Sequence, residues 1–326
     1  MRLTFIIFEG PPKIGGITSW ILNIKKSTSV DCLIFEGNYW EKIIKLISTI
    51  IHSYFKKDIL VCGDFVSQCI TYLLFFPRSR VIFVHHGPGT YKFTTFKNTF
   101  SALKNNIKGI LHKRIFCSSV KHVFVSERCL ELISKKHEVK IRNYKIIYNG
   151  FPKLPEEKFK NGPSLNKTCL KLIYAGRDHP LKNVDKVYKI SILISEYIPC
   201  KLFLCGVKRK FKDIKGLEVF SLGDLSHEKT KELIKSSDIA IFLSDFPEAN
   251  PLFLIESMHY GLGILCNTNK GSLETLKDYP TFIVPSIIKN INYQKFSDYL
   301  KINRRCFSRT CLDQVKEIRD YANYGS

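Results

Sequence analysis

Two glutamates eight residues apart, Glu248 and Glu256, stand on either side of a predicted strand-to-helix junction. The apolar run at 239–243 is typical of a short buried strand. Asn250 is a favoured N-cap residue and Pro251 suits the first helical position, so the pattern predicts a helix that starts there. The free N–H groups of a first helical turn attract anions. The stretch therefore predicts a phosphate site beside carboxylates that bind hydroxyls, which is the combination that a nucleotide sugar requires.

A pair of basic residues follows another predicted strand, 170–175. Arg177 and Lys182 lie five residues apart around a proline turn. Arginine offers a planar fork and lysine a mobile point charge, so the two are suited to one diphosphate. Two unrelated surface cations would give the same pattern. The glutamate loop in the same predicted domain favours the diphosphate interpretation.

In the first half of the chain, glycines and a histidine follow predicted strands. Gly15 and Gly16 lie in the turn after the strand predicted at 3–8, where glycine lets the backbone approach a ligand. A plain tight turn is the alternative, and the spacing is not the Gly-x-Gly-x-x-Gly fingerprint of a dehydrogenase. His86 follows the strand predicted at 81–84, at the end where such sheets bind ligands. A hydrogen-bonded structural histidine would lie there as well.

Short apolar segments alternate with helical patterns along the chain, which predicts parallel sheets with helices on both faces. One segment rich in proline, glycine and charge interrupts the rhythm. We therefore predict a Rossmann-like domain over 1–150, a linker over 151–168 and a second Rossmann-like domain over 169–305. The predicted strands span 3–8, 31–35, 59–62, 81–84, 122–125 and 145–147, and then 170–175, 201–205, 218–222, 239–243, 264–266 and 281–284.

The composition indicates an intracellular protein with an anionic partner. The chain holds 51 Lys and Arg against 29 Asp and Glu, a formal charge of +22, and no acidic residue occurs between Asp64 and Glu127. A region with charge of only one sign suggests a nucleic acid, an anionic membrane or a polyanionic substrate as the partner. Solvated surface lysines without any such partner would also explain the high total charge. The 11 cysteines form no Cys-x-x-Cys pair, which argues against a disulfide framework or zinc site and for a reducing compartment.

Residues 92–114 combine an apolar stripe with flanking basic residues, which predicts an amphipathic helix. A helix that faces the domain core is one interpretation, and contact with an anionic membrane is the other. The N-terminal apolar run is too short for a signal peptide, and no stretch reaches the ~18 apolar residues of a spanning helix. We expect a cytoplasmic protein whose membrane contact is peripheral, on the inner face of the cell membrane. No nucleic-acid-binding motif is visible, so nucleic acid is not an expected partner.

Taken in order, these motifs resemble family 4 of the retaining glycosyltransferases, which have the GT-B fold. Glu248 and Glu256 resemble the Glu-x7-Glu motif of that family, and Arg177 with Lys182 resembles its phosphate-binding pair. Further matches are the Gly15-Gly16 loop, His86 after the fourth strand, Ser126, the segment 147–150 and the acidic turn 271–274. The resemblance implies two doubly wound Rossmann-like domains that face each other across a cleft. It also implies a C-terminal helix, within 306–326, that packs back toward the first domain.

The resemblance further implies a function. The protein would transfer a hexose from a nucleoside-diphosphate sugar to an acceptor hydroxyl with retention, and without a metal ion; the sequence has no Asp-x-Asp motif. The expected acceptor is a glycan or a lipid-linked glycan in surface polysaccharide or lipopolysaccharide assembly. Arg177 and Lys182 would neutralise the diphosphate. The other expected site residues are Glu256 on the ribose, Glu248 and His86 on the sugar, and Gly15, Gly16, Asn250, Pro251 and Leu252 around the donor.

Two segments depart from the family pattern. Residues 249–252 read Ala-Asn-Pro-Leu in place of Gly-Phe-Gly-Leu, and residues 207–210 replace a glycine-rich turn with Val-Lys-Arg-Lys. The donor sugar and the nucleotide base are therefore left open. Two alternatives also stay open: a nucleotide-sugar epimerase of the same fold, and a non-catalytic basic binding module.

Overall fold

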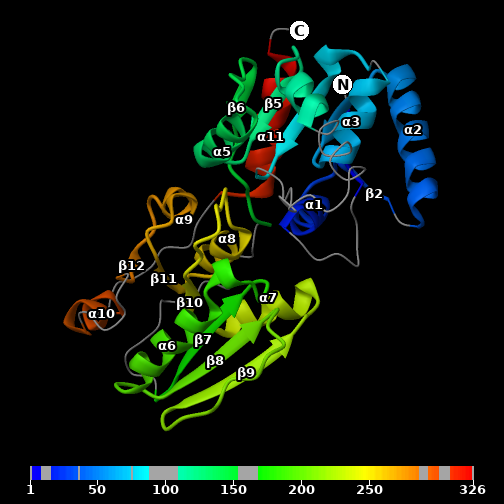
Figure 1. The fold of residues 1–326 in the computed structure, drawn as a ribbon. Coiled ribbons are helices and arrows are strands. Elements are labelled where there is room, and N and C mark those ends of the chain that lie inside the picture. Colours follow the sequence, from blue (N-terminus) through cyan, green and yellow to red (C-terminus); the bar gives the residue numbers. More distant parts are fainter. Residues whose placement is uncertain are drawn as a thin grey trace, which may run out of the picture. The chain divides into compact units, whose positions relative to one another are not determined.

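The computed structural model describes residues 2–8, 16–35, 37–74, 76–87, 109–152, 168–285, 293–300 and 309–324. The chain forms two compact units, of which the first comprises Met1–Pro152 with Thr310–Ser326 and the second Lys153–Arg309. Each unit contains a six-stranded sheet with helices on both faces (Figure 1). The predicted fold class, two doubly wound α/β domains, is confirmed.

The sheet of the first unit has the strand order β2-β1-β3-β4-β5-β6, and all neighbouring strands are parallel. The order reverses between β1 and β3, so this pair marks the switch point where such sheets bind ligands. The strands are β1 (Leu3–Ile7), β2 (Asp31–Ile34), β3 (Ile59–Cys62), β4 (Val81–His85), β5 (Lys121–Phe124) and β6 (Tyr144–Ile146).

Helices cover both faces of the first sheet because its strands are apolar on both sides. Leu46 and Ile50 of α2 pack with Ile6 and Phe83 on one face. On the other face Trp20 of α1 meets Phe5 edge-on, with ring centroids 5.9 Å apart. The helices include α1 (Gly16–Ser27), α2 (Tyr39–Lys56), α3 (Phe65–Leu73), α5 (Glu127–His137), α11 (Cys311–Asn323) and the short 3-10 helix η1 (Arg78–Arg80).

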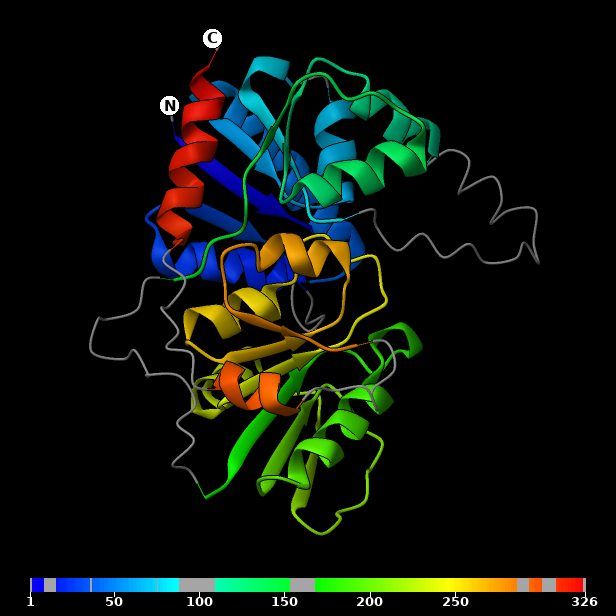
Figure 2. The ribbon, with the colours of Figure 1, turned by 90° about the vertical axis from the view of Figure 1, so that its left-hand side faces the viewer.

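The C-terminal helix α11 belongs to the first unit and packs against α1 (Figure 2). The side-chain oxygen of the buried Gln314 accepts hydrogen bonds from Trp20 Nε1 at 3.3 Å and from the Gly150 N–H at 3.2 Å. Lys121 Nζ donates to the carbonyls of Ala322 and Tyr324 at 2.6 and 2.7 Å. A cation at this position satisfies the last carbonyls of a helix and its dipole.

The sheet of the second unit has the order β12-β11-β10-β7-β8-β9, again with parallel neighbours. This is the strand order of a doubly wound nucleotide-binding domain, with its switch point between β7 and β10. The strands are β7 (Leu170–Ala175), β8 (Cys200–Cys205), β9 (Leu217–Gly223), β10 (Ile239–Phe242), β11 (Gly263–Cys266) and β12 (Thr281–Ile283).

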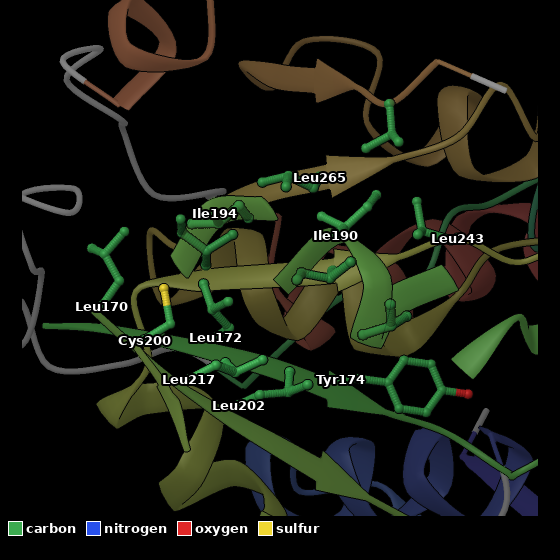
Figure 3. Packing of buried hydrophobic residues seen from close by; sticks show 14 of the residues in the cluster. Leu170, Leu172, Tyr174, Ile190, Ile194, Cys200, Leu202, Leu217, Leu243 and Leu265 are labelled. Atoms are coloured by element: carbon green, nitrogen blue, oxygen red, sulfur yellow. The ribbon is translucent and has the colours of Figure 1, made fainter. Parts of the chain in front are cut away.

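The core of the second unit lies between the sheet and the helices α6 and α10 (Figure 3). Leu172, Leu202 and Tyr174 of the strands belong to one buried cluster with Ile190 and Ile194 of α6. Helices α7 and α8 cover the other face. The helices are α6 (Val184–Ser195), α7 (His227–Ser236), α8 (Leu252–His259), α9 (Lys270–Thr275), α10 (Tyr293–Leu300) and the 3-10 helix η3 (Pro180–Lys182).

All the strands predicted from apolar runs are present, and each end differs from its prediction by at most one residue. Several other predictions concern residues outside the described ranges: Gly15, most of the 92–114 segment and most of the predicted linker. Of that segment, residues 109–114 are described and helical. Within the described ranges, no helix combines the length and the apolar character that a bilayer-spanning segment needs.

Candidate active site in the second unit

Two loops meet at the switch point of the second sheet. One follows β7 and carries Arg177 and Lys182, and the other follows β10 and carries Ser244 and Glu248. Because β7 and β10 are adjacent parallel strands, their carboxyl ends lie side by side and the loops after them converge. The structure thus brings together Lys182 and Glu248, which the sequence placed in two separate motifs.

Lys182 and Glu248 form the charged centre of the site. Lys182 Nζ pairs with Glu248 Oε1, and the two side chains are only 13% and 11% exposed. Ser244 Oγ donates to the same carboxylate oxygen at 2.6 Å, and the ammonium lies 5.3 Å from the ring centroids of Phe242 and Phe246. Burying two charges is unfavourable unless further hydrogen bonds and cation–π contacts compensate. The cluster therefore holds a cation and a carboxylate in a defined place, as a phosphate- and hydroxyl-bearing ligand requires.

Three asparagine side chains hold the loop at 243–246 in place. The amide of Asn183 donates to the first carbonyl of this loop at 2.7 Å. The amide of Asn267 donates to the second carbonyl at 3.0 Å, and that of Asn269 to the last at 2.7 Å. Asn183 has a positive φ of 53°, a conformation that asparagine tolerates better than most residues. The position of Glu248 is therefore determined by residues from two other loops, the one after η3 and the one after β11.

Gly271 allows helix α9 to approach the Glu248 loop. A Cβ atom at Gly271 would lie 1.9 Å from the carbonyl oxygen of Glu248, well inside van der Waals contact. Only glycine fits where two backbones come this close. The first residue of the predicted acidic turn thus has a steric role beside the site.

Arg177 differs from Lys182 in its surroundings. Its side chain is exposed, and no ion pair or hydrogen bond of the guanidinium is found among the described residues. The Tyr174 hydroxyl donates a hydrogen bond to the backbone carbonyl of Arg177 at 3.0 Å and fixes this part of the turn. The predicted convergence of Arg177 and Lys182 on one diphosphate stays a prediction, since Lys182 is paired with Glu248.

The basic segment at 207–210 is largely compensated by acidic neighbours. Arg209 forms ion pairs with Asp178 at 2.9 Å and with Asp185 at 2.7 Å, and the pKa of Asp185 is lowered by its hydrogen bond to that guanidinium. Lys208 pairs with Asp224 at 2.7 Å. The positive charges of Lys208 and Arg209, which replace part of a glycine-rich turn of the family pattern, are therefore neutralised by aspartates of the second unit.

Glu256 lies on the buried side of α8 and is 6% exposed. Burial raises its pKa to about 7, and the charge of Lys231 on α7 opposes this shift only in part. Its carboxyl group makes no hydrogen bond to any described residue. A half-protonated carboxyl near neutral pH can both donate to and accept from a hydroxyl. Its expected contact with a ribose stays a prediction.

The predicted start of α8 is wrong by one residue. Pro251, not Asn250, is the N-cap: its φ and ψ of −67° and 116° are extended, and its carbonyl accepts from the Leu254 N–H at 3.1 Å. The Asn250 side chain instead donates to Thr275 Oγ1 on α9 at 3.0 Å. A tertiary hydrogen bond thus replaces the local cap. Leu252 is the first helical residue.

Two further predicted site residues lie in the first unit. Gly16 is the first residue of α1, and His86 directly follows β4. The His86 ring lies 4.4 Å from the Trp20 ring between centroids, and burial lowers its pKa to about 3, so the ring is neutral at pH 7. Its Nε2 atom is buried and has no hydrogen-bond partner among the residues described.

The sequence reasoning missed the residues that support the site: Ser244 and the three asparagines. A weak signal was present for Ser244, because it follows the buried run of β10 and precedes Glu248 by four positions. The asparagines also follow strands or the η3 turn, but asparagine is common in such turns. As for metals, no group of three or more His, Cys, Asp or Glu side chains in the described part of the chain is arranged to hold one.

Comparison with known families identifies the class of the second unit. Residues 155–301 match the family model described as glycosyl transferases group 1, and this range contains the whole of the second sheet. The second unit of the chain matches the group 1 glycosyltransferases, and the resemblance inferred from the motifs is confirmed. Its activity is the transfer of a sugar from a nucleotide sugar. No curated protein matches the chain in sequence.

Solved structures establish the fold. HepE from Anabaena, in complex with UDP and glucose, aligns with a TM-score of 0.63 at 13% identity over 98% of both chains. Sucrose-phosphate synthase from Thermosynechococcus elongatus aligns with a TM-score of 0.61 at 13% identity over 98% of this chain and 96% of that one. WaaG, a glycosyltransferase involved in lipopolysaccharide biosynthesis, aligns with a TM-score of 0.54 at 14% identity over 99% and 96%. The chain has the GT-B fold.

Proposed function

We propose that this protein transfers a sugar, with retention of configuration, from a nucleoside-diphosphate sugar to an acceptor hydroxyl. The observation that carries the proposal is the Lys182–Glu248–Ser244 cluster at the switch point of a group 1 glycosyltransferase domain. Support for the donor comes from HepE, whose solved structures hold UDP with glucose and UDP-glucose. The similarity to WaaG supports a role in lipopolysaccharide or surface polysaccharide assembly.

The proposed roles follow from the charges of the residues. Arg177 and Lys182 bind the diphosphate and stabilise the charge that develops on it as the sugar leaves; one such preorganised group contributes about 10²–10³ in rate. Because Lys182 is already paired with Glu248, the diphosphate shares or takes over that ammonium when the donor binds. Glu248 is then released toward the hydroxyls of the sugar.

The remaining proposed contacts surround the donor. Glu256 binds the ribose, and His86 offers its neutral, unpartnered Nε2 to the sugar. The proposed contacts of Gly15 and Gly16 are with the sugar and the acceptor, and those of Asn250, Pro251 and Leu252 are with the donor. We propose a reaction without a metal ion, a glycan or lipid-linked acceptor, and a cytoplasmic setting.

A thermal-shift panel with UDP, GDP, ADP, CMP and their sugars tests the donor site. Ligand at ~100 times its dissociation constant stabilises a one-site protein by ~2.7 kcal/mol. We expect a selective shift with one nucleotide, which is lost in Arg177→Ala and kept in Lys215→Ala, an exposed control in the same unit. No shift with any nucleotide would contradict the donor site and favour a basic binding module.

Turnover separates transfer from epimerisation. The matching nucleotide sugar is incubated with and without an acceptor extract, and both nucleotide release and the donor sugar are followed. Transfer predicts nucleotide release that depends on acceptor. Conversion of the donor sugar without acceptor would identify an epimerase and overturn the proposal.

A further inference from the structure

Helix α2 in the first unit is apolar on two faces. Its inner face is buried through Leu46 and Ile50, which belong to the core. A second stripe follows helical spacing and faces outward. It consists of Trp40, Ile44, Ile51 and Phe55, which are 71, 66, 50 and 76% exposed, with the exposed Tyr39 and Tyr54 beside it.

This outward stripe is not used by the core of the unit. In Figure 1 α2 lies at the outer side of the first sheet, beyond α3. An open hollow runs along the helix and is lined by Ile44, Ile47, Ser48, Ile51, His52 and Phe55. A contiguous exposed apolar surface of this kind marks an interaction site in soluble proteins.

The charges around the stripe define the kind of partner. The helix contains three lysines, Lys42, Lys45 and Lys56, and its C-cap is a fourth, Lys57. Its single acid, Glu41, is engaged with Asn38 in the capping box at the N-terminus. The surface therefore combines large apolar side chains, amphipathic aromatic rings and lysines that form no ion pair with another residue in the described part of the chain.

A further cation lies at the C-terminal end of the helix. The Arg80 guanidinium lies 5.4 Å from the ring centroid of Tyr54 and donates to the Tyr54 carbonyl at 3.2 Å. Arg78 precedes it by two residues in η1. The positive charge of α2 thus continues beyond the helix into the neighbouring segment.

We propose that α2 binds flat on an anionic lipid surface, with the stripe at the boundary of the acyl chains and the lysines among the phosphates. Lysine and arginine beside an apolar helical face, with tryptophan and phenylalanine on that face, are typical of interfacial helices. A second copy of the chain fits less well, because a two-fold contact would bring the same lysines together. Lipid phosphates neutralise them instead.

The helix has the right length to lie along a membrane rather than across it. Its 18 residues span about 27 Å, and its lysines are spaced along it. Helix α2 is a different segment from residues 92–114, for which membrane contact was one of two interpretations of the sequence. It is also independent of the donor site, so the failure of one proposal leaves the other intact.

The two tryptophans of the chain allow a direct test. Trp20 is 1% exposed and Trp40 is 71% exposed, so a change in emission on lipid binding reports on Trp40. The full-length protein is titrated with vesicles of phosphatidylglycerol and phosphatidylcholine, and separately with phosphatidylcholine alone. We expect a blue shift, and quenching by brominated acyl chains, with the anionic vesicles. Trp40→Phe should abolish the signal while co-sedimentation persists.

Matched variants separate the stripe from general basicity. Ile44→Ser combined with Phe55→Ser should weaken co-sedimentation with anionic vesicles by about tenfold or more, and so should Lys42→Glu combined with Lys45→Glu. Leu312→Ser on α11 and Tyr197→Ser in the second unit replace exposed apolar residues elsewhere and should leave binding unchanged. Thermal melting of each variant confirms that it is folded, and nucleotide-induced shifts should be unaffected.

Three results would overturn the proposal. One is an emission spectrum that anionic vesicles do not change. Another is blue-shifted emission in the free protein that depends on protein concentration and coincides with a dimer in sedimentation velocity, which would assign the stripe to a second copy. The third is blue-shifted emission at every concentration with no quenching by acrylamide, which would mean that another part of the chain covers α2.

Discussion

Lys182 and Glu248, 66 residues apart in sequence, form an ion pair between the loops that follow β7 and β10. The same carboxylate oxygen accepts the hydroxyl of Ser244. In the proposed reaction the diphosphate of the donor competes with Glu248 for this ammonium. Donor binding therefore breaks the Lys182–Glu248 ion pair. The diphosphate takes the place of the carboxylate beside the ammonium, and Glu248 is released.

Lys182→Met should destabilise the second unit and abolish donor binding. Removal of one partner of a buried ion pair costs about 3–5 kcal/mol, and the slight exposure of this pair favours the lower end. Glu248→Gln should cost less, because Ser244 can still donate to the amide oxygen. The double variant should be more stable than the sum of the single effects predicts, by about 0.5–3 kcal/mol.

Urea unfolding followed by far-UV circular dichroism measures this coupling. Both tryptophans lie in the first unit, so their fluorescence would not report on the second. Effects that add within about 0.5 kcal/mol would mean that the two residues are energetically independent.

Gly271→Ala should impair the site without touching a charged residue. The new methyl group would lie 1.9 Å from the Glu248 carbonyl, and a backbone atom cannot move aside as a side chain can. We expect a lower melting temperature and a loss of turnover of at least about tenfold, because a shift of about 1 Å in a site can cost 10²-fold.

Gly109→Ala is the matched control for this substitution. A Cβ atom there meets nothing within 4 Å, and the position is helical. It should be neutral or should stabilise by up to about 1 kcal/mol. Equal activity of Gly271→Ala and Gly109→Ala would refute the steric role.

Glu256 should make the second unit less stable as the pH rises. Its pKa in the folded protein is about 7, above that of an exposed glutamate, so folding favours the protonated form. This contribution is fully present at acidic pH and is lost as the pH rises through 7, in total about 3 kcal/mol. Glu256→Gln lacks the titration. The stability of wild type relative to this variant should therefore fall between pH 5 and pH 8, and parallel pH profiles would be the contrary result.

Acid should destabilise the first unit through its buried histidines. His85 Nε2 and His122 Nδ1 are 3.0 Å apart, and burial lowers the pKa of His122 to about 4 and the pKa of His85 well below its ordinary value. Both rings are neutral in the folded state. Their contribution is complete above the ordinary histidine pKa of ~6.5 and is lost as the pH falls through the folded values, about 3 kcal/mol for His122 alone.

Trp20 fluorescence measures this acid unfolding, because the side chain is buried in the first unit. Urea midpoints between pH 7 and pH 4 should fall more steeply for wild type than for His122→Gln, even where the variant is less stable overall. An unchanged slope in the variant would show that other groups cause the acid sensitivity.

Local patterns predicted the secondary structure well. Apolar runs of three to six residues locate the strands because strand formation in a parallel sheet depends on burial of consecutive side chains. The order of βα units then implied two doubly wound domains. The start of α8 is the exception. Asn250 has the chemistry of an N-cap, but its side chain donates a tertiary hydrogen bond to Thr275 on α9.

The pairing of charges at the centre of the site could not be predicted without the tertiary structure. Lys182 and Glu248 were each recognised as candidates, but their pairing depends on β10 lying next to β7, which is a property of strand order. The contribution of Ser244 and of the three asparagines depends on the same juxtaposition.

The residue types, the strands and the resemblance to a glycosyltransferase family were therefore readable from the sequence by itself, because they depend on neighbours along the chain. The tertiary structure decided which charges meet, that Glu256 is buried, and that the stripe of α2 faces outward. A helix with apolar residues over half its circumference does not reveal which part packs inward. That choice is made by contacts between segments far apart in the chain, whose energies no local pattern contains.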